Sequence, residues 1–133
     1  MLWRGLRRGG CRALRGRLLR TDQFHVPLFH LDDAAGPSGK VAELTERLAF
    51  LAMPAFRVAF DRAGSFSNGA FALRGEAGTI GLEVLHQRLE DAFDGAPRPA
   101  HAYAPHVTLL RDRQVVEEQF IEPIEWTVRE IAL

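Results

Sequence analysis

The sequence predicts an α+β domain whose strands pair mostly in antiparallel fashion. Three observations support this fold class. Several short stretches alternate apolar and polar residues, two longer stretches place apolar residues three and four positions apart, and turn-forming residues separate them. The resulting order is strand, helix, strand, strand, helix, strand, strand. We therefore expect one sheet-forming domain with two flanking helices.

The first half of the chain supplies one strand and one helix. Residues 24–28 alternate around His25 and predict a strand that ends at the acidic pair 32–33. Residues 34–40 are rich in Gly, Pro and Ser and predict a loop. A helix is expected from 41 to about 53, before Pro54, because apolar residues recur at helical intervals at Val41, Leu44, Leu48 and Leu51.

The second half supplies four strands and the clearer helix. A strand over 56–61 leads through a turn at 63–69 into a partner strand over 70–74. Residues 79–93 predict an amphipathic helix whose core-facing stripe is Leu82, Leu85, Leu89 and Phe93. Two further strands are expected over 106–110 and 125–133. The second contains Trp126, a core candidate, and runs to the last residue without a closing loop.

Length and composition limit the class of protein. The 133 residues, with 17 basic and 17 acidic side chains, predict a single domain over 1–133. Cys11 is the only cysteine, which excludes an intrachain disulfide and a cysteine-based zinc cage. No apolar run approaches the roughly 20 residues of a membrane span. We therefore expect a cytoplasmic protein without membrane contact, and the sequence leaves the oligomeric state open.

The first twenty residues form a basic arm. They hold seven arginines and no acidic residue, so the rest of the chain carries ten basic and seventeen acidic groups. Three interpretations are open: a mitochondrial presequence, an arm that neutralises nucleic-acid phosphates, or the solvated face of a first helix that carries Leu14, Leu18 and Leu19. Residues 1–11 could lie outside the folded domain, and 11–20 could end a first helix.

One internal repeat points to chemistry. The frame H-V-x-L occurs at His25 and again at His106, 81 residues later, each time on a predicted strand. Side chains at i and i+2 of a strand share a face, so His106 and Thr108 should point together while Val107 turns away. Two imidazoles across a cleft can act as base and acid at neutral pH. Such a pair can cleave a phosphodiester without a metal.

These motifs resemble those of the two-histidine (2H) phosphoesterase superfamily, and most closely its RNA 2′,3′-cyclic phosphodiesterase branch, also called 2′-5′ RNA ligases. The second motif region, PHVTLLRD at 105–112, is similar almost residue for residue. LLRTDQFHVPLFHLDD at 18–33 resembles the first motif region, and EPIEWTVREIAL at 122–133 resembles the tryptophan strand that follows. The likeness covers about residues 12 to 133.

The resemblance implies a bilobal fold of two similar halves, with the two histidines facing each other across a central groove. It implies that His25 and His106 act as general acid and base on a 2′,3′-cyclic phosphate, opening it to a 2′-phosphate. Thr108 would bind the phosphate, and Arg111 would assist electrostatically, although its odd offset from His106 turns it to the other face of a regular strand. RNA ends or small cyclic nucleotides would be the substrates, with no cofactor and no metal.

Two departures from the family pattern define the alternative. Pro27 stands where the family has Thr or Ser, so one phosphate-binding hydroxyl is absent. The family's first strand and its strand after the tryptophan also have no counterpart, which suggests a chain trimmed at both ends with open sheet edges. The alternative function is therefore a degenerate or truncated, catalytically weak nucleotide- or RNA-binding module, or a fragment of a longer gene.

The remaining histidines and aromatic residues receive simpler interpretations. His30 lies five residues after His25, on the opposite strand face, and is expected to be structural. His86 falls beside the leucine stripe of its helix and is expected at the surface, and His101 in a solvated loop. Phe29 and Tyr103 are candidates for stacking on a base.

Overall fold

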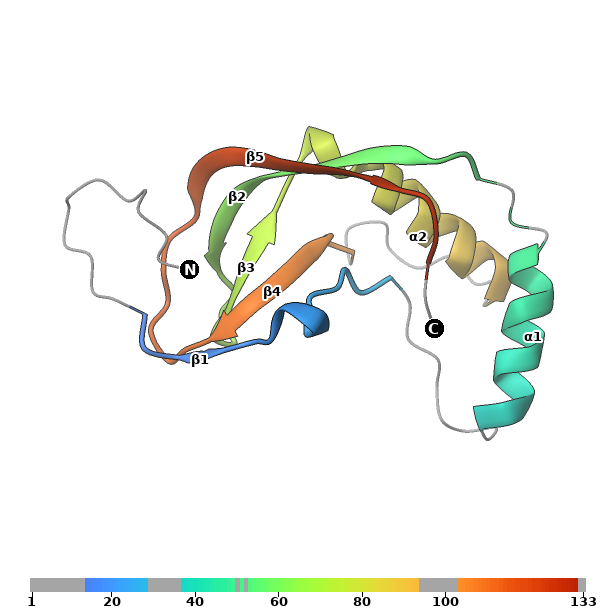
Figure 1. Cartoon of the computed structure of the whole chain (residues 1–133), viewed down its shortest axis with the longest axis horizontal. Coiled ribbons are helices and arrows are strands. Elements are labelled where there is room, and N and C mark those ends of the chain that lie inside the picture. Colours follow the sequence, from blue (N-terminus) through green and yellow to red (C-terminus); the bar gives the residue numbers. More distant parts are fainter. Residues whose placement is uncertain (1–13, 29–36, 50, 52, 94–102, 132–133) are drawn as a thin grey trace.

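The computed structural model describes residues 14–28, 37–49, 51, 53–93 and 103–131. Its five described strands form one curled sheet in the order β1-β4-β3-β2-β5, with β1 and β5 at the edges (Figure 1). Each neighbouring pair in this sheet is antiparallel. The predicted α+β class with antiparallel pairing is confirmed.

From α1 onward the elements follow the expected order with shifted boundaries. The strands are β1 (Arg17–Leu18), β2 (Phe56–Ser65), β3 (Ala70–Arg74), β4 (His106–Arg111) and β5 (Gln119–Val128). The helices are α1 (Pro37–Ala49) and α2 (Ile80–Phe93), with short 3-10 turns at Thr21–Gln23 and Ala77–Thr79.

A tight turn joins β2 to β3 and also meets the end of β4. Gly69 adopts a φ of +88°, a conformation that costs a residue with a Cβ about 1–2 kcal/mol. Its N–H donates to the carbonyl of Phe66, and its own carbonyl accepts from the N–H of Asp112 at 2.9 Å. The turn is therefore fixed both within the hairpin and to the strand that carries the second motif.

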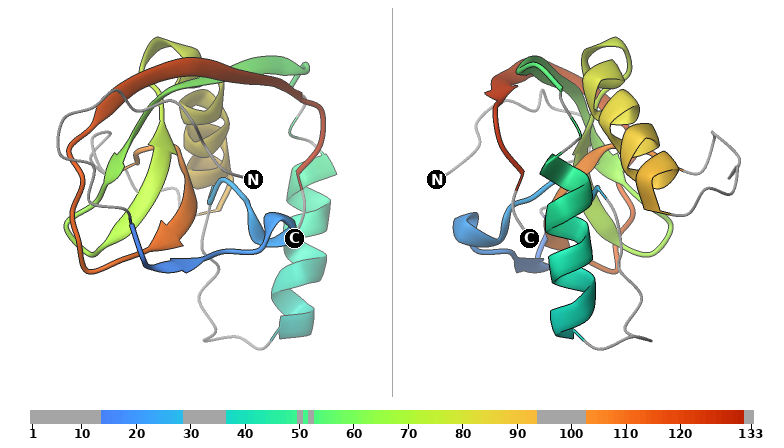
Figure 2. Two further views of the ribbon diagram at one scale, coloured as in Figure 1. Left: turned by 60° about the vertical axis from the view of Figure 1, so that its left-hand side comes forward. Right: turned by 90° about the vertical axis from the view of Figure 1, so that its right-hand side faces the viewer.

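The hydrophobic core lies between the sheet and α2. Val58 and Phe60 of β2 and Val107 of β4 form a buried cluster with Leu82 of α2. Leu85 and Leu89 are 4% and 3% exposed, which confirms the predicted stripe for its first three members. The side chain of Phe93 lies outside the described residues. Helix α2 covers this face of the sheet (Figure 2).

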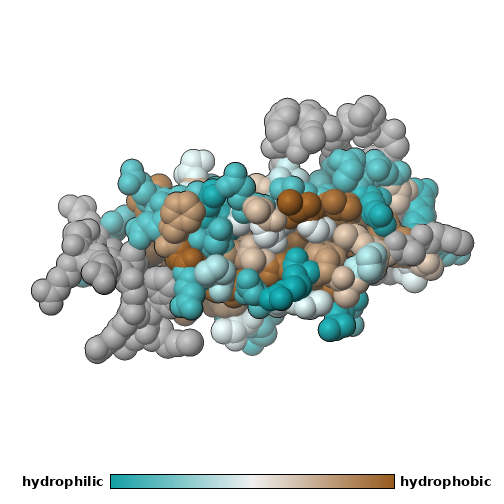
Figure 3. All heavy atoms as spheres, turned by 90° about the horizontal axis from the view of Figure 1, so that it is seen from above, coloured by the Kyte–Doolittle hydropathy of each residue, from teal (hydrophilic) through white to brown (hydrophobic). Residues whose placement is uncertain are grey.

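Strand β5 closes the other edge of the sheet. Trp126 packs on Phe60 with ring centroids 5.2 Å apart, so the prediction that Trp126 contributes to the core is confirmed. Elsewhere on β5 the side chains of Phe120 and Ile124 are exposed. Strands β5 and β2 run along the upper side of Figure 1. Seen from above, this side shows apolar patches interspersed with hydrophilic ones (Figure 3).

Two predictions for the N-terminal part were wrong within the described residues. The expected helix tail over 14–20 is extended chain, and Arg17–Leu18 pairs with β4. Leucines at three positions are too few to nucleate a helix against this sheet pairing. The expected strand over 24–28 is extended but belongs to no ladder. Pro27 has no N–H to donate, and side chains elsewhere take up the carbonyls of Pro27 and Leu28.

Other differences concern boundaries. Helix α1 begins at Pro37, a residue favoured in the first turn, and ends at Ala49 rather than at 53. Strand β2 continues to Ser65, inside the region expected to be a turn. Strand β5 begins at Gln119 and ends at Val128, so the prediction of a strand over 125–133 was wrong in both limits for the described residues.

Candidate functional site: the two histidine motifs

His106 opens β4 and is oriented by its own backbone. Its Nδ1 lies 2.9 Å from the carbonyl oxygen of Ala104, two residues earlier. The next residue, Val107, is buried in the core cluster, so the alternation of the strand directs His106 and Thr108 to the opposite face. This is the arrangement predicted for the second motif.

His25 repeats this local geometry outside the sheet. Its Nδ1 lies 2.8 Å from the carbonyl oxygen of Gln23, again two residues earlier. Val26 and Leu28 pack against the same core cluster that contains Val107, while His25 itself is exposed. The two H-V-x-L frames are therefore anchored alike, each by its apolar side chains, with the histidine held by the preceding carbonyl.

The carbonyl contacts determine which ring nitrogen of each histidine is available for proton transfer. A carbonyl oxygen only accepts hydrogen bonds, so Nδ1 of His25 and of His106 must carry the proton in each contact. In the neutral ring Nε2 then has a free lone pair, and in the protonated ring it has a proton to give. Both histidines thus hold Nε2 ready for proton transfer.

A bulge in β4 changes the orientation expected for Arg111. Strand β3 pairs Ala72 with Thr108 and Ala70 with Arg111, which makes Leu109 an extra residue on β4. Directly paired residues share a face, so Arg111 projects from the same face as Thr108. The expectation from its odd offset was therefore wrong, because a regular strand lacks this bulge.

A second arginine faces Arg111 from the neighbouring strand. Arg17 of β1 is the direct cross-strand partner of Arg111, and both side chains are exposed. Paired residues in an antiparallel ladder have Cβ atoms about 4.5–5.5 Å apart, and like charges there repel. Among the described residues neither arginine has an ion-pair partner. The pair therefore concentrates positive charge beside the second motif.

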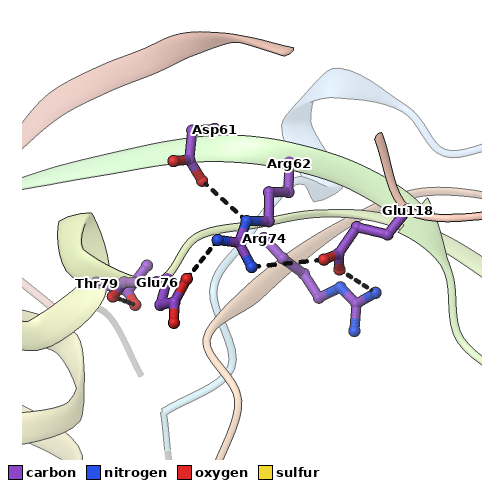
Figure 4. A network of polar contacts seen from close by, with 6 residues as sticks. All are labelled: Asp61, Arg62, Arg74, Glu76, Thr79 and Glu118. Carbon is purple, nitrogen blue, oxygen red and sulfur yellow. Dashed lines mark hydrogen bonds and ion pairs between the residues drawn. The ribbon is translucent and has the colours of Figure 1, made fainter. Parts of the chain in front are cut away.

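Three residues around His106 escaped the sequence reasoning. Arg74 of β3 lies directly opposite His106, and Phe66 from the β2–β3 turn contacts the His106 ring edge-on at 5.0 Å. The Arg74 guanidinium stacks over Phe66 at 4.7 Å and pairs with Glu118 at 2.5 Å (Figure 4). Only strand pairing brings these residues together, and no spacing in the sequence signals it.

The Arg74–Glu118 pair continues into a wider network. Glu118 also lies 3.6 Å from Arg62, which makes ion pairs with Asp61 and Glu76 (Figure 4). The acidic partners offset the charge of both arginines on this side of His106. At the other end of β4, Arg17 and Arg111 have no such acidic partner among the described residues.

Two side chains connect the first motif to the rest of the fold. The Tyr103 hydroxyl donates to the carbonyl of Pro27 at 2.9 Å, and Nδ1 of His86 donates to the carbonyl of Leu28 at 2.6 Å. The His86 side chain is 17% exposed and its Nε2 faces the carboxylate of Glu90 at 3.3 Å. The prediction that His86 is a surface residue was wrong. The spacing of apolar residues shows which side of the helix is apolar, but it does not show that a polar side chain beside the stripe has a buried hydrogen-bond partner.

Tyr103 already has an aromatic neighbour. Its ring stacks on His86 with centroids 3.9 Å apart and planes 17° from parallel, so one ring face is not available to a base. Burial, with a smaller contribution from the charge of Glu83, raises the pKa of Tyr103 to about 12. The hydroxyl therefore keeps its proton and remains a donor to Pro27 at neutral pH. The other residues singled out earlier, Phe29, His30 and His101, lie outside the described residues.

Comparison with known families agrees with this geometry. Residues 2–133 match the family described as the 2′-5′ RNA ligase superfamily. The chain belongs to this superfamily. No curated protein matches the sequence significantly.

Solved structures show the same fold. Escherichia coli LigT complexed with 3′-AMP has 25% identity and a TM-score of 0.63, and the alignment covers 84% of this chain and 66% of LigT. LigT complexed with NADP+ has 26% identity and a TM-score of 0.68, covering 85% and 66%. The protein TT0787 of Thermus thermophilus, at 23% identity and a TM-score of 0.66 with 88% and 71% covered, supports the fold alone.

The comparisons confirm the 2H phosphoesterase relationship and the LigT-like fold. This chain spans about two thirds of the length of LigT. Within the described ranges, no helix is long and apolar enough to cross a membrane. A search of the same residues finds no cluster of three or more His, Cys, Asp or Glu side chains suited to a metal ion.

Proposed function

We propose that this protein is a cyclic phosphodiesterase that opens 2′,3′-cyclic phosphates, at RNA ends or on small nucleotides, to 2′-phosphates. One observation carries the proposal: both H-V-x-L frames hold the histidine Nδ1 on the carbonyl two residues earlier. A shared core anchors both frames. With Nδ1 engaged in both frames, each ring has Nε2 left for proton transfer, so one can act as base and the other as acid.

Acid–base chemistry at these two rings accounts for the whole reaction. Nε2 of one histidine takes a proton from water as the water oxygen bonds to phosphorus. Nε2 of the other gives a proton to the 3′ oxygen as its bond to phosphorus breaks. Each such group contributes about 10²- to 10⁴-fold to the rate. The product is a 2′-phosphate with a free 3′ hydroxyl, and the histidine pair ends with its protons exchanged.

Phosphate binding is assigned to the polar face of β4. Thr108 shares this face with His106, and the bulge at Leu109 adds Arg111. A hydroxyl and a guanidinium stabilise negative charge that grows as the phosphate becomes five-coordinate. Arg17, opposite Arg111, extends the positive charge to where a flanking phosphate of an RNA chain would bind.

The ligands of the structural neighbours fit this assignment. LigT has been crystallised with 3′-AMP, ATP, NADP+ and phosphate, which share phosphate groups and, except for phosphate itself, a nucleoside. For the present chain we propose RNA ends or small cyclic nucleotides as substrates and the cytoplasm as the location.

Replacement of each histidine by asparagine tests the proposal. The asparagine amide nitrogen can still donate to the preceding carbonyl but has no titratable nitrogen for the reaction. We expect His106→Asn and His25→Asn each to lower kcat on a 2′,3′-cyclic nucleotide by at least about 100-fold, with unchanged circular dichroism. Unchanged turnover in His106→Asn would refute the assignment.

Pro27 favours a second candidate, a module that binds nucleotides with little turnover. The family has a hydroxyl residue at this position, and the carbonyl of Pro27 is occupied by Tyr103. Loss of one hydrogen bond to the transition state costs about 1–3 kcal/mol. If Pro27 limits activity, Pro27→Thr should raise kcat by about 5- to 150-fold. A wild-type protein that binds 3′-AMP without turnover, combined with gain in Pro27→Thr, would favour the second candidate.

A further inference from the structure

The segment that carries His25 lacks the backbone support that fixes His106. His106 belongs to β4 and pairs there with Arg74 of β3, while β1 pairs with the far end of the same strand, at Leu110 and Arg111. His25 follows a 3-10 turn and precedes Pro27, in residues 24–28 that join no ladder. Half-buried Val26 and Leu28 anchor the segment to the core, but apolar contacts are non-directional and do not define how far it slides.

Two hydrogen bonds give this segment the directional support that strand pairing gives to β4. Tyr103 Oη donates to the Pro27 carbonyl at 2.9 Å, and His86 Nδ1 donates to the Leu28 carbonyl at 2.6 Å. They hold two consecutive peptide groups, the first of them two residues after His25. Successive peptide groups held at their oxygens leave little freedom to the backbone between them.

The two donors also fix each other. The His86 and Tyr103 rings stack at 3.9 Å, and Glu90 of α2 lies 3.3 Å from the other nitrogen of His86. The side chains of His86 and Glu90 are 17% and 11% exposed, so packing restricts both rotamers. Tyr103 lies three residues before His106, and the connection from the second motif to the first is therefore short.

We infer that His86 and Tyr103 are positioning residues that set the placement of His25 relative to His106. The inference rests on the proposed function for its catalytic consequence. Neither residue needs to touch the substrate. A misplacement of about 1 Å in a catalytic group can cost about 100-fold in rate, so modest loosening of residues 24–28 should appear in kcat.

The test uses variants that remove one contact at a time in the full chain. Tyr103→Phe keeps the ring stack and loses the bond to Pro27, and His86→Ala loses the bond to Leu28. His86→Asn can restore a donor near the position of Nδ1. Gln87→Ala is the matched control, since Gln87 lies exposed on the same helix and bonds Asp91, away from the first motif.

We expect Tyr103→Phe and His86→Ala to lower kcat on a cyclic nucleotide by about tenfold, with KM little changed. His86→Asn should recover most of the loss, and Gln87→Ala should match the wild type. Full kcat in both Tyr103→Phe and His86→Ala would overturn the inference. So would a loss that follows only the fraction of folded protein in thermal unfolding, because that indicates a structural role alone.

A measurement independent of turnover separates this inference from the proposed function. In ¹⁵N NMR spectra, the His25 imidazole shifts and the amide exchange at Val26 and Leu28 should change in His86→Ala, while those of His106 stay constant. Titration with 3′-AMP gives the affinity of the same variants. If the wild type has no turnover, the proposed function fails. The positioning role then stands with a change confined to His25 and falls with unchanged His25 signals.

Discussion

The substitution Gly16→Ala, which adds one methyl group beside β1, should detach β1 from β4 and so loosen the first motif from the second. A Cβ built at Gly16 would lie 2.0 Å from the carbonyl oxygen of Arg111, whereas ordinary van der Waals contact begins at 3.4 Å. The backbone of Gly16 and β4 would have to part by about 1.4 Å, the difference of these two distances. Hydrogen bonds of 2.8–2.9 Å on either side, from Arg15 N–H to Asp112 and from Leu19 N–H to Leu109, would be lost.

The expected cost of Gly16→Ala follows from these two bonds. At about 0.5–1.5 kcal/mol each, their loss lowers the free energy of unfolding by about 1–3 kcal/mol. Urea unfolding measures this change, and amide exchange at Leu19 shows whether β1 has left β4. Because residues 20–28 follow β1 directly, kcat should fall as well. Wild-type protection at Leu19 with unchanged unfolding would refute the reasoning, and Arg15→Ala, which keeps the backbone donor, is the control.

Two further predictions concern charge. Arg17→Gln should leave turnover of a cyclic mononucleotide nearly unchanged but weaken binding of an oligonucleotide with a cyclic end, with a salt dependence reduced by about one charge. The control is Arg57→Gln, on β2 beside the far edge strand β5, and equal losses for both substrates would contradict the role of Arg17. Tyr103 is the only tyrosine, so the absorbance of tyrosinate reports it alone, and its midpoint should be near pH 12. Since the pKa of Tyr103 is raised in the folded state, its contribution to stability is complete below about pH 10 and is lost as the pH rises toward 12. A titration midpoint near pH 10 in the folded protein would refute this prediction.

The sequence predicted those parts of the fold that depend on local periodicity. The stripe of Leu82, Leu85 and Leu89 located α2 because each member faces the core. The alternation around His106 predicted both its strand and the shared face with Thr108. The alternation around His25 was equally regular, yet it produced extended chain without a ladder. Alternation reports which side chains are buried, and it does not report whether the backbone finds a pairing partner.

The rest of the site depends on contacts between distant segments. Phe66, Arg74 and Glu118 meet His106 through strand pairing and a turn, and their positions follow no common spacing. His86 was placed at the surface because its partners, the Leu28 carbonyl and Tyr103, lie 58 and 17 residues away in the chain. A buried polar side chain can be recognised only when its hydrogen-bond partner is known.

The bulge in β4 makes the length of this strand, as well as its composition, a determinant of the site. Deletion of Leu109 would remove the bulge and leave Arg111 two positions after Thr108, so a regular strand would keep both side chains on one face and Arg111 opposite Ala70. Substitutions at Leu109 would leave the residue count unchanged and keep Arg111 in place. Relatives whose strand lacks the extra residue would therefore be expected to carry their cationic residue one position closer to the histidine, at an even spacing that keeps both side chains on one face.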